Sequence, residues 1–307
     1  MPELSVCICT YRRPQLLARL LTAVFAQNLA AQRFEVVVLD NDAQQSAASV
    51  LAEFAARFPQ RLTSLTLSVS NISLARNAVI AAARGQYLCL IDDDECPQPD
   101  WLEQLLRVQQ QYAADVVFAP VVPEYQDGVP EWIRRGGYFE RARMPSGTRI
   151  DDKNARSGNV LLRRAALAPS VDGNGPFDTA YGNSGGEDTM LFRRLLAAGA
   201  GMVWCDEAAV SEQVPLERAS ARWLLQRSFR TGQLFMRTEL AMAAQPRRRA
   251  AYLVLRALLQ AVLAALLALG LLVFKPLRAF HWARIVASQC GKLNHFRGKK
   301  PHIYGQA

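Results

Sequence analysis

Residues 87–101 have the sequence YLCLIDDDECPQPDW, which places three aspartates and a glutamate directly after an apolar run. The run at 87–92 is typical of a buried strand, so the acids begin where the chain leaves the core. Neighbouring carboxylates repel one another unless a positive charge lies among them. The stretch is therefore either a solvated turn or a cation site, and the rest of the chain has to decide between the two.

The sequence around this stretch alternates between strand and helix patterns. Short β-branched, apolar runs predict buried strands, and longer runs with apolar residues on one face predict helices. The predicted strands are 4–9, 34–40, 62–69 and 87–92, and the helices between them are 12–27, 44–58 and 74–84, the last capped by Ser73 and ended by Gly85. This order predicts an α/β fold with a mostly parallel central sheet, in which ligands bind beyond the carboxyl ends of the strands.

Polar residues stand at three of these strand ends. They are Thr10 with Tyr11, Asp40 to Asp42, and Asp92 to Glu95. Because the carboxyl ends of parallel strands meet at one edge of a sheet, we expect the three groups to share a crevice. The first turn, TYRRP, lacks the glycines of a dinucleotide-binding fold, and the chain contains no P-loop pattern. Both of those nucleotide-binding classes are disfavoured.

The pattern becomes less regular after residue 115. Strands are predicted within 115–122 and 157–164, and the segment between them is long enough to be a binding loop. Residues 181–208 then predict a glycine-rich loop, a helix with an acidic start and a last strand. The clearest boundary lies near Gln245-Pro246-Arg247. We therefore expect a catalytic domain, 1–245, with a nucleotide-binding half (1–115) and an acceptor-binding half (116–245), followed by a tail, 246–307.

The net charge of +9 is concentrated in the tail. Residues 246–307 hold 11 of the 36 Lys/Arg and no Asp or Glu, so the remainder has 25 basic and 27 acidic residues. Basic residues beside a very apolar segment favour an anionic membrane surface as the partner, and no recognition module for a nucleic acid accompanies them. The six cysteines include no C-x-x-C pair and are typical of buried thiols in a reducing compartment. No signal peptide is visible at the N-terminus.

The uncharged segment 257–274 predicts an apolar helix of about 27 Å at ~1.5 Å per residue. That length is close to a bilayer core of ~30 Å. Basic residues flank the segment on both sides, so the rule that basic residues lie on the cytoplasmic side of a membrane helix does not predict an orientation. We expect a re-entrant or interfacial helical hairpin on the cytoplasmic face of the inner membrane rather than one full crossing.

Four motifs in a fixed order carry a family resemblance. They are VCICTYRRP (6–14), VVVLDND (36–42), LARNAVIAAARGQYLCLIDDDE (74–95) followed by PDW, and GGEDTMLFRRLLAAG (185–199). From about residue 3 to 235 the chain resembles the family-2 inverting glycosyltransferases of GT-A fold, particularly bacterial surface-polysaccharide and lipid-linked-sugar transferases. The resemblance implies a nucleotide-diphospho-sugar donor, with uridine the commonest base, and a glycan or lipid-linked acceptor.

The resemblance also assigns the site residues. The nucleotide pocket falls on Thr10, Tyr11, Arg13, Asp40, Asn41, Asp42, Arg76, Asp92 and Asp93. A Mn²⁺ or Mg²⁺ ion falls on Asp94 and Asp92, which offer the hard oxygen ligands that these ions prefer beside phosphates. The base that deprotonates the acceptor falls on Asp188, with Glu187 as its orienting neighbour. Ordinary packing and ion pairing remain open as roles for Tyr11 and Arg76.

Four further residues are assigned to the donor sugar or the acceptor. The SGN segment, Ser157, Gly158 and Asn159, falls where the family brings its backbone close to the sugar phosphate, an approach that glycine permits. Trp132 either stacks on a sugar ring or is a hydrophobic anchor of its loop.

One motif departs from the family pattern. Processive members carry Q/R-x-x-R-W, whereas residues 218–223 are RASARW, which is one residue longer. We therefore expect single-sugar addition. Arg222, Arg227 and Arg230 nearby either neutralise the leaving diphosphate or form a solvated helix face. The remaining alternatives are a nucleotidyltransferase, which the absent glycine-rich basic loop disfavours, and an inactive membrane-anchored sugar-nucleotide binder, which intact Asp94 and Asp188 disfavour.

Overall fold

The computed structural model describes residues 1–152, 154–168, 170 and 172–297. Within them, seven strands form a central sheet in the order β3-β2-β1-β4-β8-β6-β9. Their bounds are Leu4–Thr10 (β1), Phe34–Asp40 (β2), Leu62–Thr66 (β3), Tyr87–Asp92 (β4), Val116–Phe118 (β6), Val160–Arg163 (β8) and Met202–Trp204 (β9). Only β8 runs antiparallel to its neighbours in this part of the chain, so the predicted mostly parallel sheet is confirmed.

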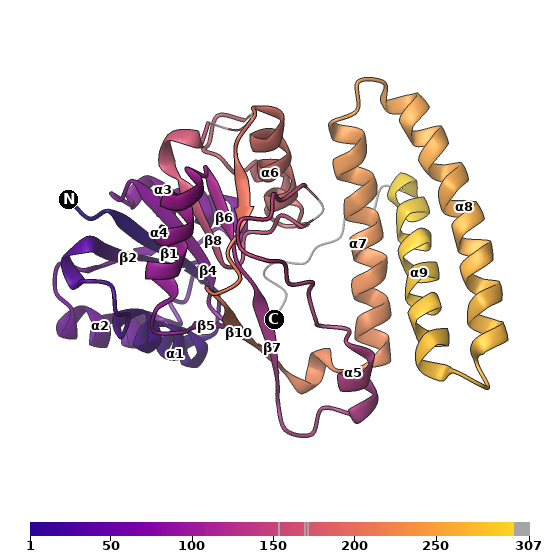
Figure 1. The fold of residues 1–307 in the computed structure, drawn as a ribbon, viewed down its shortest axis with the longest axis horizontal. Coiled ribbons are helices and arrows are strands. Elements are labelled where there is room, and N and C mark those ends of the chain that lie inside the picture. The colour runs from indigo at the N-terminus through magenta and orange to yellow at the C-terminus, as the bar shows by residue number, and fades with distance from the viewer. Residues whose placement is uncertain (153, 169, 171, 298–307) are drawn as a thin grey trace.

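Helices cover both faces of this sheet (Figure 1). Successive side chains of a strand point to opposite faces, and both faces of β1 are apolar. Val6 and Ile8 therefore pack in one core beside α1, whereas Cys7 lies in the other beside α3. The helices of the α/β part are α1 (Pro14–Phe25), α2 (Ala48–Arg57), α3 (Ile72–Ala82), α4 (Trp101–Tyr112), α5 (Glu131–Gly136) and α6 (Glu187–Ala197), with short 3₁₀ turns η1 (Ala31–Arg33), η2 (Arg164–Ala166), η3 (Thr179–Tyr181) and η4 (Leu216–Arg218). A further 3₁₀ turn, η5 (His295–Arg297), lies near the C-terminus.

The cap of α3 differs from the prediction. Asn71 is the N-cap, and its Oδ1 accepts a hydrogen bond from the Leu74 N–H at 3.0 Å. Ser73 lies inside the first turn, fully buried. Asparagine and serine are comparably good caps, so side-chain preference alone does not distinguish a helix that starts after Asn71 from one that starts after Ser73.

A second, three-stranded sheet lies beside the carboxyl end of β4. It consists of β5 (Glu95–Pro97), β10 (Val210–Val214) and β7 (Val121–Tyr125), with β10 in the middle. In the antiparallel register of β5 and β10, Glu212 lies opposite Glu95. Through this pairing, the last part of the α/β chain comes to the acidic stretch.

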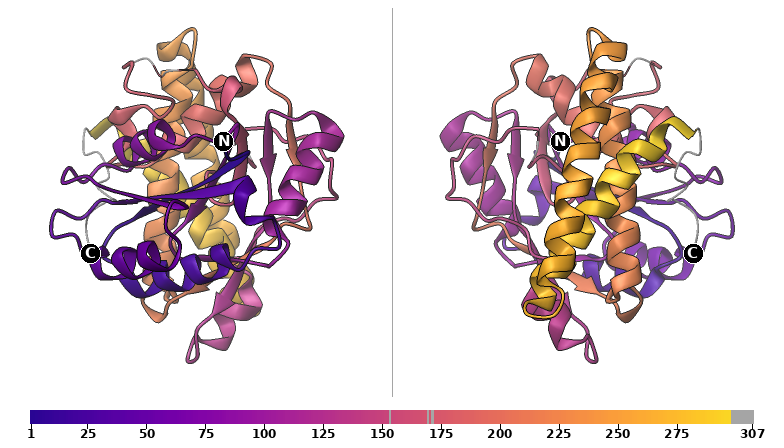
Figure 2. Two further views of the ribbon diagram at one scale, coloured as in Figure 1. Left: turned by 90° about the vertical axis from the view of Figure 1, so that its left-hand side faces the viewer. Right: turned by 90° about the vertical axis from the view of Figure 1, so that its right-hand side faces the viewer.

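Three long helices stand on one side of the α/β part (Figures 1 and 2). They are α7 (Ala221–Ala241), α8 (Pro246–Leu271) and α9 (Pro276–Asn294), and α9 packs against both of the others. A Cβ at Gly232 of α7 would overlap the Ser288 carbonyl, and one at Gly291 of α9 would overlap the Phe229 carbonyl. The two backbones are thus in direct contact. The expected boundary near Gln245 falls at the turn between α7 and α8. By its packing on α9, however, α7 belongs with α8 and α9, and these three helices are called the helical layer below.

The outer helix α8 exposes a row of apolar side chains. The exposed fractions of Leu259, Leu266 and Leu269 are 64%, 63% and 69%. Of the residues described, those in α8 form one helix that is long and apolar enough to cross a membrane. Only 17% of its apolar window is buried, so this helix is not the core of a soluble bundle.

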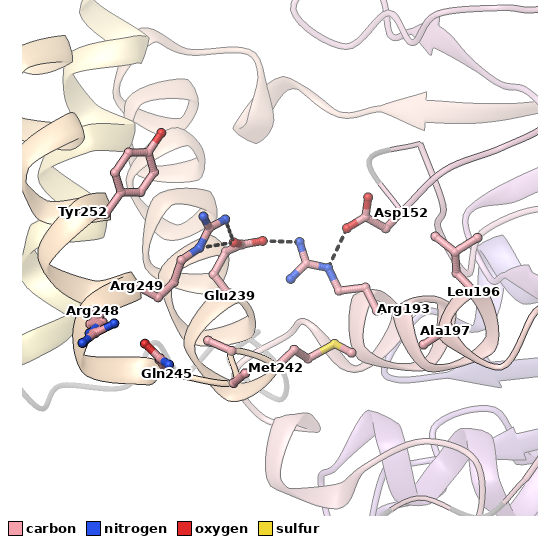
Figure 3. Close-up of a pocket in the computed structure, with 12 residues that line it drawn as sticks. Asp152, Arg193, Leu196, Ala197, Glu239, Met242, Gln245, Arg248, Arg249 and Tyr252 are labelled. Carbon is pink, nitrogen blue, oxygen red and sulfur yellow. Dashed lines mark hydrogen bonds and ion pairs between the residues drawn. The ribbon is translucent and has the colours of Figure 1, made fainter.

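Ion pairs join the helical layer to α6 (Figure 3). Arg193 of α6 donates to Asp152 at 2.8 Å and to Glu239 of α7 at 2.5 Å, and Glu239 also accepts from Arg249 of α8. These residues line a cavity of about 840 Å³. It lies beside the carboxyl-terminal half of α6, whereas Glu187 and Asp188 begin that helix.

Candidate functional site

The ends of β1 and β4 are joined by polar side chains. Thr10 Oγ1 donates to Asp93 Oδ2 at 2.8 Å, and Arg13 at the start of α1 donates to Asp93 Oδ1 at 3.0 Å and Asp94 Oδ2 at 3.1 Å. Burial raises the pKa of Asp93 to about 6, and the charge of Arg13 opposes that rise. The predicted convergence of these two strand ends is therefore present in the structure.

The end of β2 uses two of its three polar side chains to hold the neighbouring loops. Asp40 accepts the N–H groups of Asp42 and Ala47 at 3.0 and 2.8 Å. The amide of Asn41 donates to the carbonyls of Leu67 and Val69 at 2.8 and 2.7 Å. Both side chains are buried. Asp40 and Asn41 therefore fix the backbone of the loops around the end of β2.

Two predicted nucleotide contacts, Tyr11 and Asp42, lie in the loops that follow β1 and β2. Arg12 reaches across from the first turn to pair with Asp42 at 3.4 Å, and its guanidinium stands 5.0 Å from the centre of the Tyr11 ring. The side chains of Tyr11 and Asp42 thus lie on facing loops. Such a pair of loops offers a flat ring and a carboxylate to a nucleoside.

Arg76 of α3 connects the acidic stretch to the start of α6. Its guanidinium donates to Glu187 Oε1 at 2.6 Å and to Asp92 Oδ1 at 3.2 Å. Arg76 is buried, with its guanidinium carbon 5.5 Å from the centre of the Phe177 ring. A buried arginine between two carboxylates fixes both in place, because its fork has a rigid geometry.

The GGED segment makes a tight turn into α6. Gly185 and Gly186 have φ of +79° and +93°, a conformation that strains any residue with a Cβ. Burial and then the charge of Asp188 raise the pKa of Glu187 above its usual range, and Arg76 opposes this. Asp188 is half-buried, and its Oδ1 accepts the Thr189 N–H at 2.6 Å. One acid is thus buried and the other is partly exposed.

Glu212 of β10, in the second sheet, was missed by sequence reasoning. Glu212 pairs with Arg141 at 3.0 Å and with Arg218 at 3.4 Å, and Arg218 also pairs with Asp94 at 3.6 Å. Nothing in the local sequence VSEQV marks Glu212, because only its pairing with β5 brings it to the site. Glu95 is buried, and burial followed by the charge of Asp92 raises its pKa.

The SGN segment lies against the acidic stretch. A Cβ at Gly158 would stand 2.6 Å from Glu95 Oε1 and 3.3 Å from Asp92 Oδ2, so only glycine fits. Ser157 is buried beside it. Asn159 is fully buried: its Oδ1 accepts from Trp101 Nε1 at 2.7 Å, and its amide donates to two carbonyls at 2.8 Å. Its side chain therefore holds the loop and does not face a sugar.

Trp132 lies outside the crevice. Its ring meets those of Tyr138 and Phe280 edge-on, with centres 5.7 and 5.2 Å away. These contacts join α5 to α9. The hydrophobic-anchor alternative describes this position.

The described residues contain no group of three or more His, Cys, Asp or Glu side chains arranged to hold a metal ion. The acidic stretch nevertheless offers the carboxylate oxygens of Asp92 and Asp94. Burial and then the charge of Asp92 raise the pKa of Asp94, although Arg13 and Arg218 oppose them. Mg²⁺ and Mn²⁺ sites characteristically use one or two carboxylates and complete the coordination shell with phosphates and water, so Asp92 and Asp94 fit such an ion.

Comparison with known proteins identifies this arrangement. Residues 5–168 match the model of the family described as "Glycosyl transferase family 2". The chain belongs to this glycosyltransferase family. It is 36% identical over 232 residues to the succinoglycan biosynthesis protein ExoM of Rhizobium meliloti, covering 75% of this chain and 73% of that one. It is 25% identical over 208 residues to the glycosyltransferase AglE of Haloferax volcanii, covering 67% and 66%.

Solved structures show that this glycosyltransferase has the GT-A-like fold that the motifs predicted. The mannosyltransferase PcManGT of Pyrobaculum calidifontis, in complex with GDP-Man and Mn²⁺, superposes with a TM-score of 0.65 at 20% identity, over 95% of this chain and 87% of that one. S. aureus TarS 1-349, in complex with UDP, gives 0.54 at 15% identity, over 97% and 92%. The predicted family, fold and enzyme class are confirmed.

Proposed function

We propose that this glycosyltransferase moves one sugar, with inversion, from a nucleotide-diphospho-sugar to a lipid-linked or surface-glycan acceptor, and that it requires Mn²⁺ or Mg²⁺. The single observation that carries the proposal is the position of Arg76, which ties Asp92 at the end of β4 to Glu187 at the start of α6. The acids proposed to bind the donor and those proposed to activate the acceptor thereby face one crevice. UDP is the proposed nucleotide.

The donor half follows from the strand ends. Tyr11 and Asp42 would hold the base, with Asp93 near the ribose, and Asp94 with Asp92 would hold the metal ion at the diphosphate. A bound divalent cation stabilises the negative charge of a departing diphosphate. Arg13 and Arg218 already pair with Asp94 and keep this carboxylate aimed into the crevice. The cofactor proposal thus rests on the two carboxylates at and just after the end of β4, Asp92 and Asp94.

The acceptor half uses the two acids of α6 differently. Asp188 is the proposed base, because it is partly exposed in the first turn of α6, at the positive end of the helix dipole. It would take the proton of the acceptor hydroxyl as that oxygen attacks the anomeric carbon. Glu187 is engaged by Arg76 and is a positioning residue. A single addition agrees with the RASARW segment, in which Arg218 pairs with Asp94 rather than continuing the pattern of processive enzymes.

The helical layer supports action at a membrane. The apolar row of α8 is exposed along its length, and Arg247 to Arg249 precede it. Because α9 returns beside α8, the proposed arrangement is a hairpin lying in the cytoplasmic interface of the inner membrane. The catalytic domain is proposed to end near Gln245, with the tail as its anchor.

A binding screen followed by turnover tests the proposal. Nucleotide sugars with Mn²⁺ are screened by thermal unfolding of the full chain, since a ligand at ~100 times its dissociation constant adds ~2.7 kcal/mol of apparent stability. The best donor is then incubated with enzyme and EDTA-treated enzyme, and nucleoside diphosphate release is followed, with Asp188→Asn as the matched control. Release of pyrophosphate from a nucleoside triphosphate and a sugar phosphate would instead indicate a nucleotidyltransferase. Binding without turnover would indicate an inactive binder.

A further inference from the structure

Four arginines gather where the helical layer meets the catalytic crevice, and three of them have no carboxylate partner. Arg141 and Arg156 line one cavity of about 40 Å³ that also reaches Gly158. Arg227 comes from α7 and Arg284 from α9. In the described part of the chain, Arg141 pairs with Glu212, whereas Arg156, Arg227 and Arg284 form no ion pair.

Aromatic residues of one loop hold two of these cations. The Arg227 guanidinium stands 5.6 Å from the centre of the Phe139 ring and 5.4 Å from that of Trp223, and these two rings are stacked. The Arg284 guanidinium stands 5.0 Å from the neighbouring Tyr138 ring. Stacking fixes the planes of both guanidiniums. Apart from the Nε–H of Arg284, which donates to Ser228 Oγ at 3.4 Å, their N–H groups are left to bind something else.

The electrostatic balance of the cluster is unfavourable as it stands. Burial, and then the positive charge of Arg141, lower the pKa of Arg227 to about 10, and Arg156 and Arg284 act in the same direction. Burial and Arg141 likewise lower the pKa of Arg156. Partly buried like charges without enough counterions are costly, and an anion bound among them removes that cost.

We propose that Arg141, Arg156, Arg227 and Arg284 bind the phosphate groups of the lipid that carries the acceptor. Planar guanidiniums match phosphate oxygens by paired hydrogen bonds. The inference rests on the proposed function and adds the chemical class of the acceptor's carrier.

Glu212 lies between this cluster and Asp94 of the proposed donor site, because it pairs with Arg141 of the cluster and with Arg218, which in turn pairs with Asp94. The cavity of Arg141 and Arg156 also reaches Gly158, which lies beside Asp92, so the nucleotide arm of the experiment below separates the two ligands. Arg284 belongs to α9, which packs directly on the exposed apolar helix α8. A phosphate bound here thus lies between the membrane-facing helices and Asp188, whose charge acts on Arg156.

Farnesyl diphosphate is a soluble probe of this site. It is titrated by calorimetry into the full chain in detergent, with EDTA present so that the metal site does not contribute. Arg227→Gln is expected to weaken binding roughly tenfold or more, because it removes a charged hydrogen-bond donor. The matched control, Arg222→Gln, changes an exposed arginine of the same helix and is expected to bind as wild type. Should Arg227→Gln unfold, Arg284→Gln takes its place.

Two further arms identify the source of the phosphate. Binding of UDP with Mn²⁺ is expected to be unchanged in Arg227→Gln, and an equal loss there would overturn the proposal by assigning the cluster to the donor. Flotation with phosphatidylglycerol vesicles is expected to be unchanged as well. A loss confined to the vesicles would assign the cluster to bulk headgroups and overturn it, as would wild-type affinity for farnesyl diphosphate. If the wild type releases nucleoside diphosphate in the donor assay while the probe binds equally to all variants, only this inference fails.

Discussion

The guanidinium of Arg76 donates a hydrogen bond to Glu187 at 2.6 Å, although 111 residues separate the two in the chain. Both side chains are buried, and Glu187 Oε2 has no hydrogen-bond partner among the described residues. This pair therefore holds the start of α6 beside α3. Because Asp188 follows Glu187 directly, the proposed base takes its position from a residue of the donor half.

Replacing Arg76 by methionine tests this pair. Arg76→Met leaves a buried carboxylate without its cation and is expected to lower the free energy of unfolding by about 3 kcal/mol. Glu187→Gln in the same chain should restore most of that loss, because a neutral amide needs no counterion. Urea unfolding of the two single variants and the double variant measures the coupling. Strictly additive losses would show that the two side chains do not depend on one another.

The metal proposal makes a prediction about stability as well as rate. Asp94→Asn is expected to abolish transfer, and EDTA should silence the wild type. The same variant should not lower the melting temperature of the metal-free protein, because the pKa of Asp94 is raised and its charge is unfavourable there. Full activity in EDTA, or a fully active Asp94→Asn, would contradict the metal assignment.

The two acids of α6 separate in kinetics. Asp188→Asn keeps the shape of the side chain and is expected to lower kcat by ~10²–10⁴ with donor affinity preserved. Glu187→Gln should affect donor binding and stability as well, since it changes the partner of Arg76. Single-turnover rates and nucleotide titrations measure both. A near wild-type Asp188→Asn beside an inactive Glu187→Gln would exchange the two roles.

Asp93 gives the stability of the protein a pH dependence. Its pKa is raised from 3.8 to about 6, so the folded chain binds the proton more tightly than the unfolded chain. The contribution of this group to stability therefore falls as pH rises from about 4 to about 6, by up to about 3 kcal/mol. Asp93→Asn should remove this slope, which denaturation at pH 4, 5, 6 and 7 measures. An unchanged slope would show that Asp93 titrates normally.

The proposed membrane anchor predicts that binding to vesicles depends on the apolar row of α8. Leu259→Glu and Leu266→Glu place charges on exposed positions, so they should leave the fold intact and release the chain from vesicles. Val69→Glu, at an exposed position of the α/β part, is the matched control and should float as wild type. Flotation of Leu259→Glu and Leu266→Glu at wild-type levels would contradict the proposed anchor.

The strands, most helices and the family were predictable because their signals are local. The apolar runs at 34–40 and 87–92 form strands with the predicted bounds. Glu212 was not predictable, since its place depends on a strand pairing across more than 100 residues. For Asn159, the SGN motif predicts the correct loop. Only the fold shows that its side-chain amide donates to backbone carbonyls of the protein. The arginine cluster likewise gathers from a loop, α7 and α9.

The backbone contact of Gly232 with Ser288 has a consequence for which acceptors can be used. Helices that touch along their main chains cannot tilt independently, so α9, and α8 with it, keep one orientation relative to the crevice. A bilayer held by α8, as proposed, would then lie at one distance from Asp188. An acceptor glycan whose end stands too near the lipid, or too far from it, would miss the proposed base, so the length of the acceptor would decide whether this enzyme adds its sugar.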